Sequence, residues 1–445
     1  MWRNSGPSKE RDTIFALASA PGRAGIAVVR VSGPEADEAI RSLTRREPPS
    51  ERRVVLRSLF DLINNDRIDE ALVLFFLPPR SYTGEKVAEF QIHGGRAVQA
   101  ALLSALGALE GLRPAEPGEF TRRAVENGRL DLTQAEAIAD LVAAETGAQR
   151  RLALRQYDGG LAELYEEWRG RLIRVAAWIE AAIDFPDEDI PVGASRESRA
   201  ALCAILRDIQ AHLADGRRGE ILREGLHVAV IGPPNAGKSS LVNALARRDV
   251  AIVSEFPGTT RDVIEVRLDL SGYPVILADT AGLRESQDSI EQEGVRRARV
   301  RAEAADLRVL VLDGAAGTPA AIPDEDVRPG DIVVWNKADV AAAKTGAGLW
   351  ISAKTGEGLP ELLGQIARRA ADLLSGGEAP VLTRARHRHA LEEAARSLAA
   401  AIATPEPELA AEHIRLALRA IGRITGRVDL DELLDVVFRD FCIGK

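Results

Sequence analysis

The spacing of apolar residues changes along the chain and divides it into segments of different kinds. Residues 1 to about 120 mix short β-branched runs with short helical patterns, which indicates an α+β region. The runs predict strands at Gly25–Val31, Ile68–Leu77 and Val87–His93, and helices at Glu35–Leu43 and Ala97–Leu109.

Longer helices are predicted after residue 120. Thr133 and Glu136 have the spacing of a capping box and predict the start of one helix. Apolar residues at steps of three and four from Leu161 to Ile183 predict a second, and a third covers roughly 196–213. This part of the chain is therefore expected to be all-helical.

The period changes again near residue 223, where short apolar runs alternate with helical segments. The runs that predict buried strands are His227–Ile231, Val275–Ala278, Val309–Leu312 and Ile332–Trp335. Such alternation is typical of a parallel sheet covered by helices. Residues 384–440 are helical again, so the pattern predicts a helical domain with an α/β domain inserted. The predicted domains are 1–120, 121–222, 223–374 and 375–445, the second and fourth forming the two parts of the helical domain.

Composition and charge narrow the function classes. The 445 residues are 46% apolar and 28% charged, which is typical of a globular protein of about three domains. The net charge of -9 excludes a broad RNA-binding face, so any RNA contact is expected to be a local patch. Two cysteines form neither a disulfide framework nor a zinc site. With no apolar run long enough to be a signal peptide or to span a bilayer, we expect a cytoplasmic location and no membrane association.

A phosphate-binding loop is predicted directly after the strand His227–Ile231. The residues from Gly232 to Ser239 read Gly-Pro-Pro-Asn-Ala-Gly-Lys-Ser and precede a helical run, as this motif requires. Its backbone N–H groups and the helix N-terminus hold negative charge. Lys238 is expected to reach the β- and γ-phosphates, and Ser239 to ligate Mg²⁺.

Three further motifs follow in the order found in GTPases. Asp279-Thr280-Ala281-Gly282 ends a strand, where the Asp can hold a magnesium-bound water. Asn336-Lys337-Ala338-Asp339 ends another, where the Asp can accept hydrogen bonds from two guanine N–H groups that adenine lacks. Ser352-Ala353-Lys354 matches the loop behind the base. The predicted GTP-binding residues are Asn235, Ala236, Gly237, Lys238, Ser239, Ser240, Ser254, Glu255, Phe256, Pro257, Gly258, Thr259, Thr260, Asp279, Thr280, Ala281, Gly282, Asn336, Lys337, Asp339, Ser352, Ala353 and Lys354.

The residue that would position the attacking water is unusual. Many GTPases have Gln directly after the Asp-x-x-Gly motif, but this chain has Leu283, which cannot orient water. Carboxylates downstream can do so, and spacing does not choose among Glu285, Asp288, Glu291 and Glu293. In the loop around Thr260, which can complete the magnesium shell, carbonyl groups together with Asn235 suggest a monovalent cation beside the phosphates, in the role of an arginine finger.

Motifs outside the α/β domain indicate which GTPase family this chain resembles. They are Pro21–Ile26, Ser81–Glu85, His93–Gly95, Pro117–Thr121, Leu130–Ala137 and the terminal Cys442–Lys445. Together with the nucleotide motifs, they are similar to those of the tRNA wobble-uridine modification GTPases, the MnmE (TrmE) family. The resemblance covers essentially the whole chain.

The resemblance implies an N-terminal folate-binding and dimerising domain, a helical domain, and an inserted P-loop GTPase domain. It also implies that the protein is a homodimer. With a FAD- and NADH-dependent partner, MnmG, proteins of this family add an aminomethyl or carboxymethylaminomethyl group to C5 of uridine 34 in certain tRNAs. The one-carbon unit comes from 5-formyl- or 5,10-methylene-tetrahydrofolate. Potassium-dependent dimerisation of the GTPase domains activates hydrolysis.

The same resemblance implies roles for particular residues. The potassium ligands are Asn235, Ser254, Phe256 and Thr259; the magnesium ligands are Ser239 and Thr260; and Glu291 is the water-positioning carboxylate. The folate contacts are Arg30, Glu89, Lys445 and Arg129, where the family usually has Lys. Cys442 has no visible base beside it, so a structural or folate-site role is favoured over a nucleophilic one.

Two questions stay open at this point. The basic cluster Arg384–His389 either contacts tRNA phosphates or forms a solvated face paired with Glu392 and Glu393.

The alternative function is a GTP-switched, RNA-binding ribosome-assembly factor, which predicts an RNA-binding appendage such as a KH domain after the GTPase domain. A stand-alone folate-dependent transferase leaves the GTPase motifs unexplained.

Overall fold

The computed structural model describes most of the chain, in two compact units. The described residues are 12–184, 192–248, 250–252, 265–279, 303–316, 327–344, 346–375, 380–427 and 444, without the side chains of 192–195 and Asp279. One unit comprises residues 1–139 and 419–445, and the other comprises 140–418. Each unit is described by itself.

The first unit contains a six-stranded sheet with the strand order β3-β4-β5-β2-β1-β6. Its strands are β1 (Thr13–Leu17), β2 (Ile26–Ser32), β3 (Val55–Phe60), β4 (Arg67–Phe76), β5 (Val87–His93) and β6 (Leu112–Pro114). Neighbouring strands are antiparallel, except that β6 runs parallel to β1. The helices of this region are α1 (Ala36–Thr44), α2 (Arg96–Gly107), α3 (Glu119–Glu126) and α4 (Leu132–Ala143).

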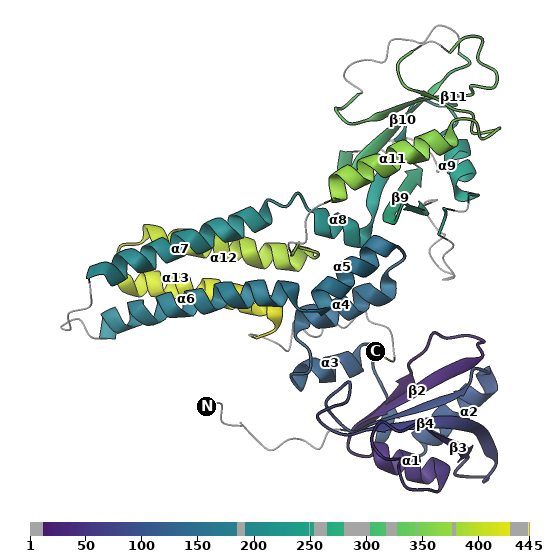
Figure 1. Cartoon of the computed structure of the whole chain (residues 1–445), viewed down its shortest axis with the longest axis vertical. Helices are drawn as coiled ribbons and strands as arrows, with labels where there is room; N and C mark the ends of the chain where they lie inside the picture. The colour runs from purple at the N-terminus through teal and green to yellow at the C-terminus, as the bar shows by residue number, and fades with distance from the viewer. Residues whose placement is uncertain are drawn as a thin grey trace, which may run out of the picture. The chain divides into compact units, whose positions relative to one another are not determined.

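Alternation along the strands gives this sheet two different faces. Ala27, Val29 and Val31 of β2 are buried with residues of both α1 and α2, so these helices cover one face (Figure 1). Arg30 and Ser32 point to the other face. The predicted strands and helices are confirmed within one or two residues, and β1, β3 and β6 are added to them.

The start of α4 differs from the prediction. The side chain of Asp131, and not that of Thr133, accepts from the backbone N–H of Gln134 at 2.9 Å, and Gln134 accepts in return from the N–H of Asp131 at 3.1 Å. The capping box is therefore Asp131 with Gln134. The helix begins two residues earlier than the Thr133–Glu136 pattern suggested, because Leu132 is completely buried and belongs to its first turn.

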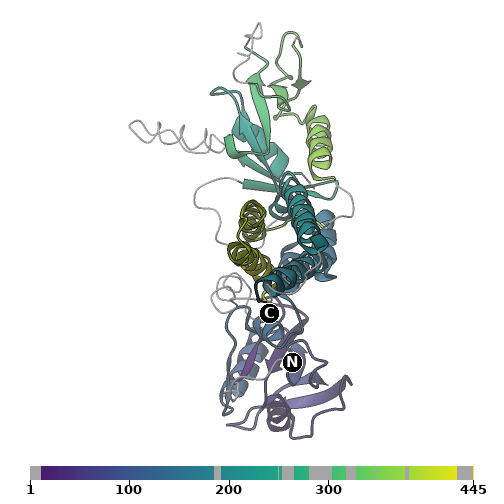
Figure 2. The ribbon, with the colours of Figure 1, turned by 90° about the vertical axis from the view of Figure 1, so that its left-hand side faces the viewer.

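Helices from both sides of the inserted domain pack together in the second unit. They are α5 (Gly147–Tyr157), α6 (Gly160–Asp184), α7 (Val192–Leu213), α8 (Arg218–Glu224), α12 (Ala385–Ala403) and, as far as Leu418, α13 (Pro407–Thr425). Helix α12 packs on α7, and Arg415 of α13 pairs with Glu180 of α6 at 2.7 Å. Figure 2 shows several of these helices close to end-on. The predicted helical domain with an inserted α/β domain is confirmed.

The inserted domain has a second six-stranded sheet, with the order β12-β11-β10-β7-β9-β8. Its elements are β7 (Leu226–Ile231), α9 (Lys238–Ala246), β8 (Glu265–Leu270), β9 (Tyr273–Asp279), β10 (Leu307–Asp313), β11 (Ile332–Asn336), β12 (Leu349–Trp350) and α11 (Leu359–Leu374). The strands are parallel except for β8, which is antiparallel to β9 at the edge. The parallel strands therefore place their carboxyl ends along one edge of the sheet.

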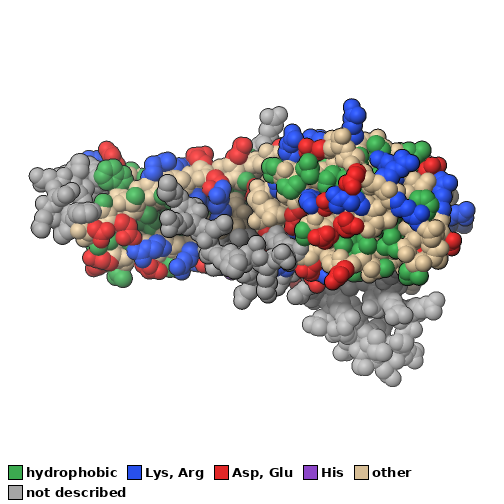
Figure 3. Space-filling view, turned by 90° about the horizontal axis from the view of Figure 1, so that it is seen from below, with side chains coloured by type: hydrophobic (Ala, Val, Ile, Leu, Met, Phe, Trp, Pro, Cys, Tyr) green, Lys and Arg blue, Asp and Glu red, His purple; other side chains and the backbone are tan. Residues whose placement is uncertain are grey.

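The net charge of -9 argues against a broad basic face on the surface. Figure 3 shows basic, acidic and hydrophobic side chains interspersed on the face viewed there, rather than one continuous basic surface. Within the described residues, no helix is long and apolar enough to cross a membrane.

Candidate functional site

A glycine-rich loop joins β7 to α9 at the carboxyl edge of the second sheet. Gly232 and Gly237 have φ values of +142° and +91°, and a Cβ atom at these positions would overlap Val311 or Asn336 respectively. Both close approach and positive φ therefore require glycine. Asn235, at φ +62°, lies between them. This backbone has the sharp turns that direct successive N–H groups toward an anion.

The positive charge of Lys238 lies against this loop. Its ammonium group donates to the carbonyl oxygens of Gly232 and Pro233, both at 2.9 Å. Ser239 and Ser240 follow in the first turn of α9, where free N–H groups and the helix dipole favour negative charge. The loop and the helix start can therefore bind phosphate, and the Ser239 hydroxyl is a hard oxygen donor of the type that Mg²⁺ prefers.

Asn336 connects three loops at the same edge. This residue is 3% exposed; its Nδ2 donates to the carbonyl of Ala236 at 2.8 Å, and its Oδ1 accepts from the N–H of Ala353 at 3.0 Å. A buried amide satisfied on both sides fixes the spacing between the phosphate loop and the loop after β12. The next residue, Lys337, pairs with Asp313 at the end of β10, at 2.6 Å.

The Asp339 carboxylate is held in one orientation by Ser352. The Ser352 hydroxyl donates to Oδ1 of Asp339 at 2.7 Å, while the same hydroxyl oxygen accepts from the N–H of Thr355 at 3.1 Å. The hydrogen bond from Ser352 lowers the pKa of Asp339 below its usual value. Asp339 is therefore an anion at neutral pH. Its two oxygens can each accept one of the two N–H groups on the edge of guanine, because Oδ1 keeps a lone pair beside the Ser352 hydroxyl.

A second polar site lies on the open face of the first sheet. Arg30 and Glu89 are directly paired residues of β2 and β5, with Nε to Oε1 at 2.9 Å, and both side chains are less than one-fifth exposed. The Arg30 guanidinium lies 4.9 Å from the centre of the Tyr82 ring and 5.7 Å from that of Phe120. Sequence reasoning noted Tyr82 and Phe120 only within longer motifs and did not assign them to a site.

Two further segments approach this part of the first unit. Atoms of the Arg129 side chain lie 3.1 Å from the position that a Cβ on Gly84 would take, two residues from Tyr82. Gly444 lies so close to the carbonyl of Leu17 that a Cβ would overlap it, and Leu17 pairs with Val29, the neighbour of Arg30. The fold thus brings Arg129 beside the segment that contains Tyr82, and Gly444 beside β1, the strand paired with β2.

Comparisons with known proteins give the family. Residues 13–129 match the family model described as the GTP-binding protein TrmE N-terminus, and residues 132–442 match that of the MnmE helical domain. The chain belongs to the MnmE family. The tRNA modification GTPase MnmE of Parvibaculum lavamentivorans is 55% identical over 98% of this chain and 100% of that protein. Those of Rhodospirillum rubrum and Caulobacter vibrioides are 54% and 51% identical, over 98% of this chain and at least 99% of theirs.

Family membership confirms the resemblance found in the motifs. This MnmE-family chain is an enzyme, a GTPase, with an N-terminal domain, a helical domain and a P-loop GTPase domain. Its structure brings the predicted residues of the phosphate loop, the Asn336–Asp339 motif and the Ser352–Lys354 loop to one edge of the sheet.

Several predicted residues of this GTPase lie outside the described part of the chain. They are Ser254, Glu255, Phe256, Pro257, Gly258, Thr259, Thr260, Thr280, Ala281, Gly282, Glu285, Asp288, Glu291, Glu293, Cys442 and Lys445. Asp279 is described only by its backbone, as the last residue of β9. The assignments of these residues stay predictions.

The basic cluster at the start of α12 is largely used inside the protein. Arg384 pairs with Asp140 at 2.7 Å, Arg388 pairs with Asp215 and Glu220 at 2.8 and 2.9 Å, and His387 is 1% exposed. Arg384 and Arg388 are therefore engaged by carboxylates other than Glu392 and Glu393 rather than open to phosphates. The two alternatives for Arg386 and His389 stay predictions. Acidic residues of α4, of α8 and of the segment before α8, all distant in sequence, determined these pairings.

Proposed function

We propose that this MnmE-family GTPase adds an aminomethyl or carboxymethylaminomethyl group to C5 of uridine 34 in certain tRNAs. It acts in the cytoplasm as a homodimer with the FAD- and NADH-dependent partner MnmG, and takes its one-carbon unit from 5-formyl- or 5,10-methylene-tetrahydrofolate. The observation that supports this most strongly is the similarity over 98% of the chain to proteins named as tRNA modification GTPases.

The residues at the carboxyl edge of the second sheet bind GTP in this proposal. Lys238 and the N–H groups of the loop hold the phosphates, Ser239 and Thr260 hold Mg²⁺, and Asp339 accepts from guanine. The order of these groups along the edge supports the assignment, because the Asn336 amide fixes the phosphate loop relative to the base loop.

Hydrolysis needs a group that orients water, since Leu283 follows the Asp-x-x-Gly motif. We assign this role to Glu291, which positions the water and accepts its proton. Potassium held by Asn235, Ser254, Phe256 and Thr259 places positive charge beside the phosphates when two GTPase domains dimerise. The left-handed backbone of Asn235 within the phosphate loop supports its part in this set.

The polar site of the first sheet fits a folate. In the described part of the chain, Oε1 of Glu89 accepts a hydrogen bond from Arg30, and Oε2 is then available to accept from the amide-like edge of a pterin. Arg129 and Lys445 supply cations for the carboxylates of the folate tail. The approach of Gly444 to Leu17 supports the inclusion of Lys445, its neighbour in sequence.

The experiment that tests the function is nucleoside mass spectrometry of tRNA from cells that lack the gene. We expect the C5-substituted wobble uridine to disappear, and to return with the wild-type gene but not with Lys238→Ala. An unchanged uridine profile would leave the GTPase standing but overturn the modification role. The ribosome-assembly function would then be tested, although the described chain after the GTPase domain forms helices α12 and α13.

A further inference from the structure

The hairpin formed by β8 and β9 extends across the second sheet from one edge to the other. β8 begins three residues after the Gly258–Asp262 motif, and β9 ends at Asp279, the first residue of the Asp-x-x-Gly motif. Because β9 is parallel to β7 and β8 is antiparallel, the turn at Ser271–Gly272 lies at the edge opposite the phosphate loop. At roughly 3.3 Å per residue, the turn is about 20 Å from the ends that bear the nucleotide motifs.

The turn is tight and its shape is fixed. Ser271 and Gly272 have φ values of +56° and +89°, the signature of a two-residue turn between the paired residues Leu270 and Tyr273. The carboxylate of Asp269 also accepts from the N–H of Gly272 at 2.7 Å. A movement of either strand along its axis is therefore expected to move the turn as well.

This turn directly contacts the start of α5 in the helical domain. The carbonyl of Gly272 accepts from the N–H of Ala148 at 3.0 Å. Ala148 is in the first turn of α5, where backbone N–H groups have no partner within the helix. The hairpin thus supplies a capping acceptor for a helix of the neighbouring domain.

Two side-chain contacts flank this hydrogen bond. Arg267 of β8 pairs with Glu145, just before α5, at 3.1 Å. Tyr273, the first residue of β9, packs against a small apolar cluster that includes Ala148 and Leu152 of α5. The Arg267–Glu145 pair is partly exposed, and such pairs contribute little to stability. Any effect of this ion pair on function therefore comes from the position in which it holds β8 relative to α5.

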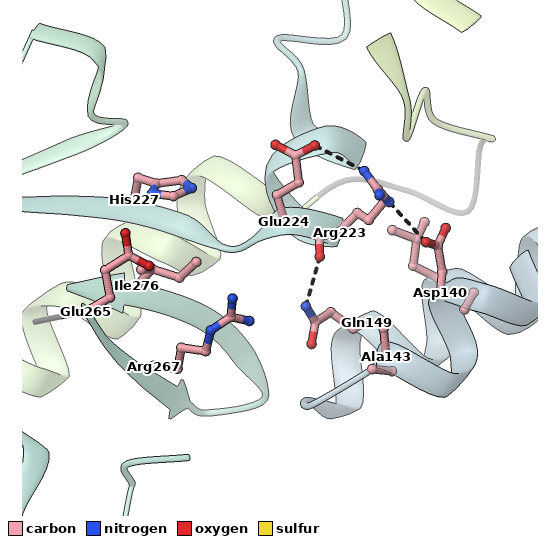
Figure 4. A pocket seen from close by; sticks show the side chains of 12 residues that line it. Asp140, Ala143, Gln149, Arg223, Glu224, His227, Glu265, Arg267 and Ile276 are labelled. Atoms are coloured by element: carbon pink, nitrogen blue, oxygen red, sulfur yellow. Dashed lines mark hydrogen bonds and ion pairs between the residues drawn. The ribbon is translucent and has the colours of Figure 1, made fainter. Parts of the chain in front are cut away.

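Beside these contacts, the space between the hairpin and helices α4 and α5 is not filled by side chains. A cavity of about 410 Å³ separates Glu265, Arg267 and Ile276 of the hairpin from Asp140 and Gln149 of α4 and α5 (Figure 4). On its far side, Gln149 donates to the carbonyl of Arg223 at 2.9 Å, and the Arg223 guanidinium pairs with Asp140. The hairpin is thus held at its turn and has open space along part of its length, unlike a close-packed core.

We propose that Glu145 and the Ala148 N–H are positioning groups for GTP hydrolysis, and that the β8–β9 hairpin transmits the nucleotide state to α5. This inference rests on the proposed function, because the motifs at both ends of the hairpin are assigned to the nucleotide there. It gives a physical connection between the GTPase domain and the helical domain: a shift of the hairpin changes the Gly272–Ala148 hydrogen bond.

The test is hydrogen exchange of the first turn of α5 in the full-length chain, with GDP and with a non-hydrolysable GTP analogue. The variants are Glu145→Arg, Arg267→Glu and the double exchange, with Ser271→Asn as the control. Ser271 is exposed, and Asn tolerates the same left-handed backbone. Thermal unfolding of each variant verifies that it is folded, and Glu145→Gln replaces Glu145→Arg if the latter is not.

We expect the wild type and the control to show different exchange at α5 in the two nucleotide states. In the single variants this difference is lost and kcat falls at least about fivefold with little change in KM, and the double variant restores both. Equal exchange in both states in a wild type that hydrolyses GTP, or single variants that retain the difference, would overturn the inference alone. A wild type that does not bind GTP would instead overturn the proposed function.

Discussion

Replacing Asp339 by Asn tests the guanine assignment most directly. The Ser352 hydroxyl donates to Oδ1 of Asp339, and its oxygen is occupied as an acceptor by the N–H of Thr355. In Asp339→Asn we expect the amide oxygen to keep the place of Oδ1, because the Ser352 hydroxyl donates its proton there. The new NH₂ group then occupies the place of Oδ2 and faces the base.

The consequence is a reversal of hydrogen-bonding polarity at the base. Guanine presents two N–H donors to this position. The 2-amino group then faces the new NH₂ group, a donor against a donor, and N1–H keeps an acceptor that is no longer charged. Since each hydrogen bond to a charged acceptor contributes a factor of about ten or more to binding, we expect GTP affinity to fall roughly a hundredfold or more. Xanthine has a carbonyl in place of the 2-amino group, so binding of xanthosine triphosphate is expected to rise.

The assay is equilibrium titration of fluorescent GTP and xanthosine triphosphate analogues against wild type, Asp339→Asn and Ser352→Ala. Ser352→Ala keeps the carboxylate but removes the hydrogen bond that orients it, so a smaller loss without a change of base preference is expected. If Asp339→Asn bound GTP as tightly as the wild type, the carboxylate would not contact the base, and the assignment of this edge would be wrong.

Four further predictions concern the other sites. Glu291→Ala is expected to keep GTP affinity and lose about a hundredfold or more in hydrolysis, measured by phosphate release; normal turnover would give the role to another carboxylate. GTP turnover should be higher in potassium than in sodium and should rise with protein concentration, and equal rates at every concentration would exclude potassium-dependent dimerisation. Glu89→Gln should weaken binding of 5-formyl-tetrahydrofolate about tenfold or more in calorimetry without changing GTP hydrolysis, and unchanged folate binding would remove Glu89 from that site. Burial, assisted by Arg388 and opposed by Asp215, lowers the pKa of His212. The stability that neutral His212 contributes is therefore complete above its ordinary pKa of about 6.5 and is lost as the pH falls through the lowered pKa. His212→Gln should flatten the dependence of the free energy of unfolding on pH in this range, and an unchanged slope in chemical denaturation would refute it.

Local patterns in the sequence were sufficient for the elements and for the nucleotide motifs. Strands β7, β9, β10 and β11 were predicted within about two residues, because buried parallel strands are continuous apolar runs. The motifs at their ends could be recognised because each one is a short contiguous segment. The local patterns did not predict β1, β3, β6 or β8, and they placed the α4 cap at Thr133 instead of Asp131.

The sequence by itself determined the family, the GTPase motifs and the insertion of one domain into another. Only the tertiary structure decided which charges meet: Arg30 with Glu89, 59 residues apart, and Arg384 with Asp140, 244 residues apart. It also decided that Gly444 approaches Leu17 and that the β8–β9 turn caps α5. The physical reason is that such contacts depend on strand register and helix packing, which sum many weak interactions over the whole domain and are not encoded in any single segment.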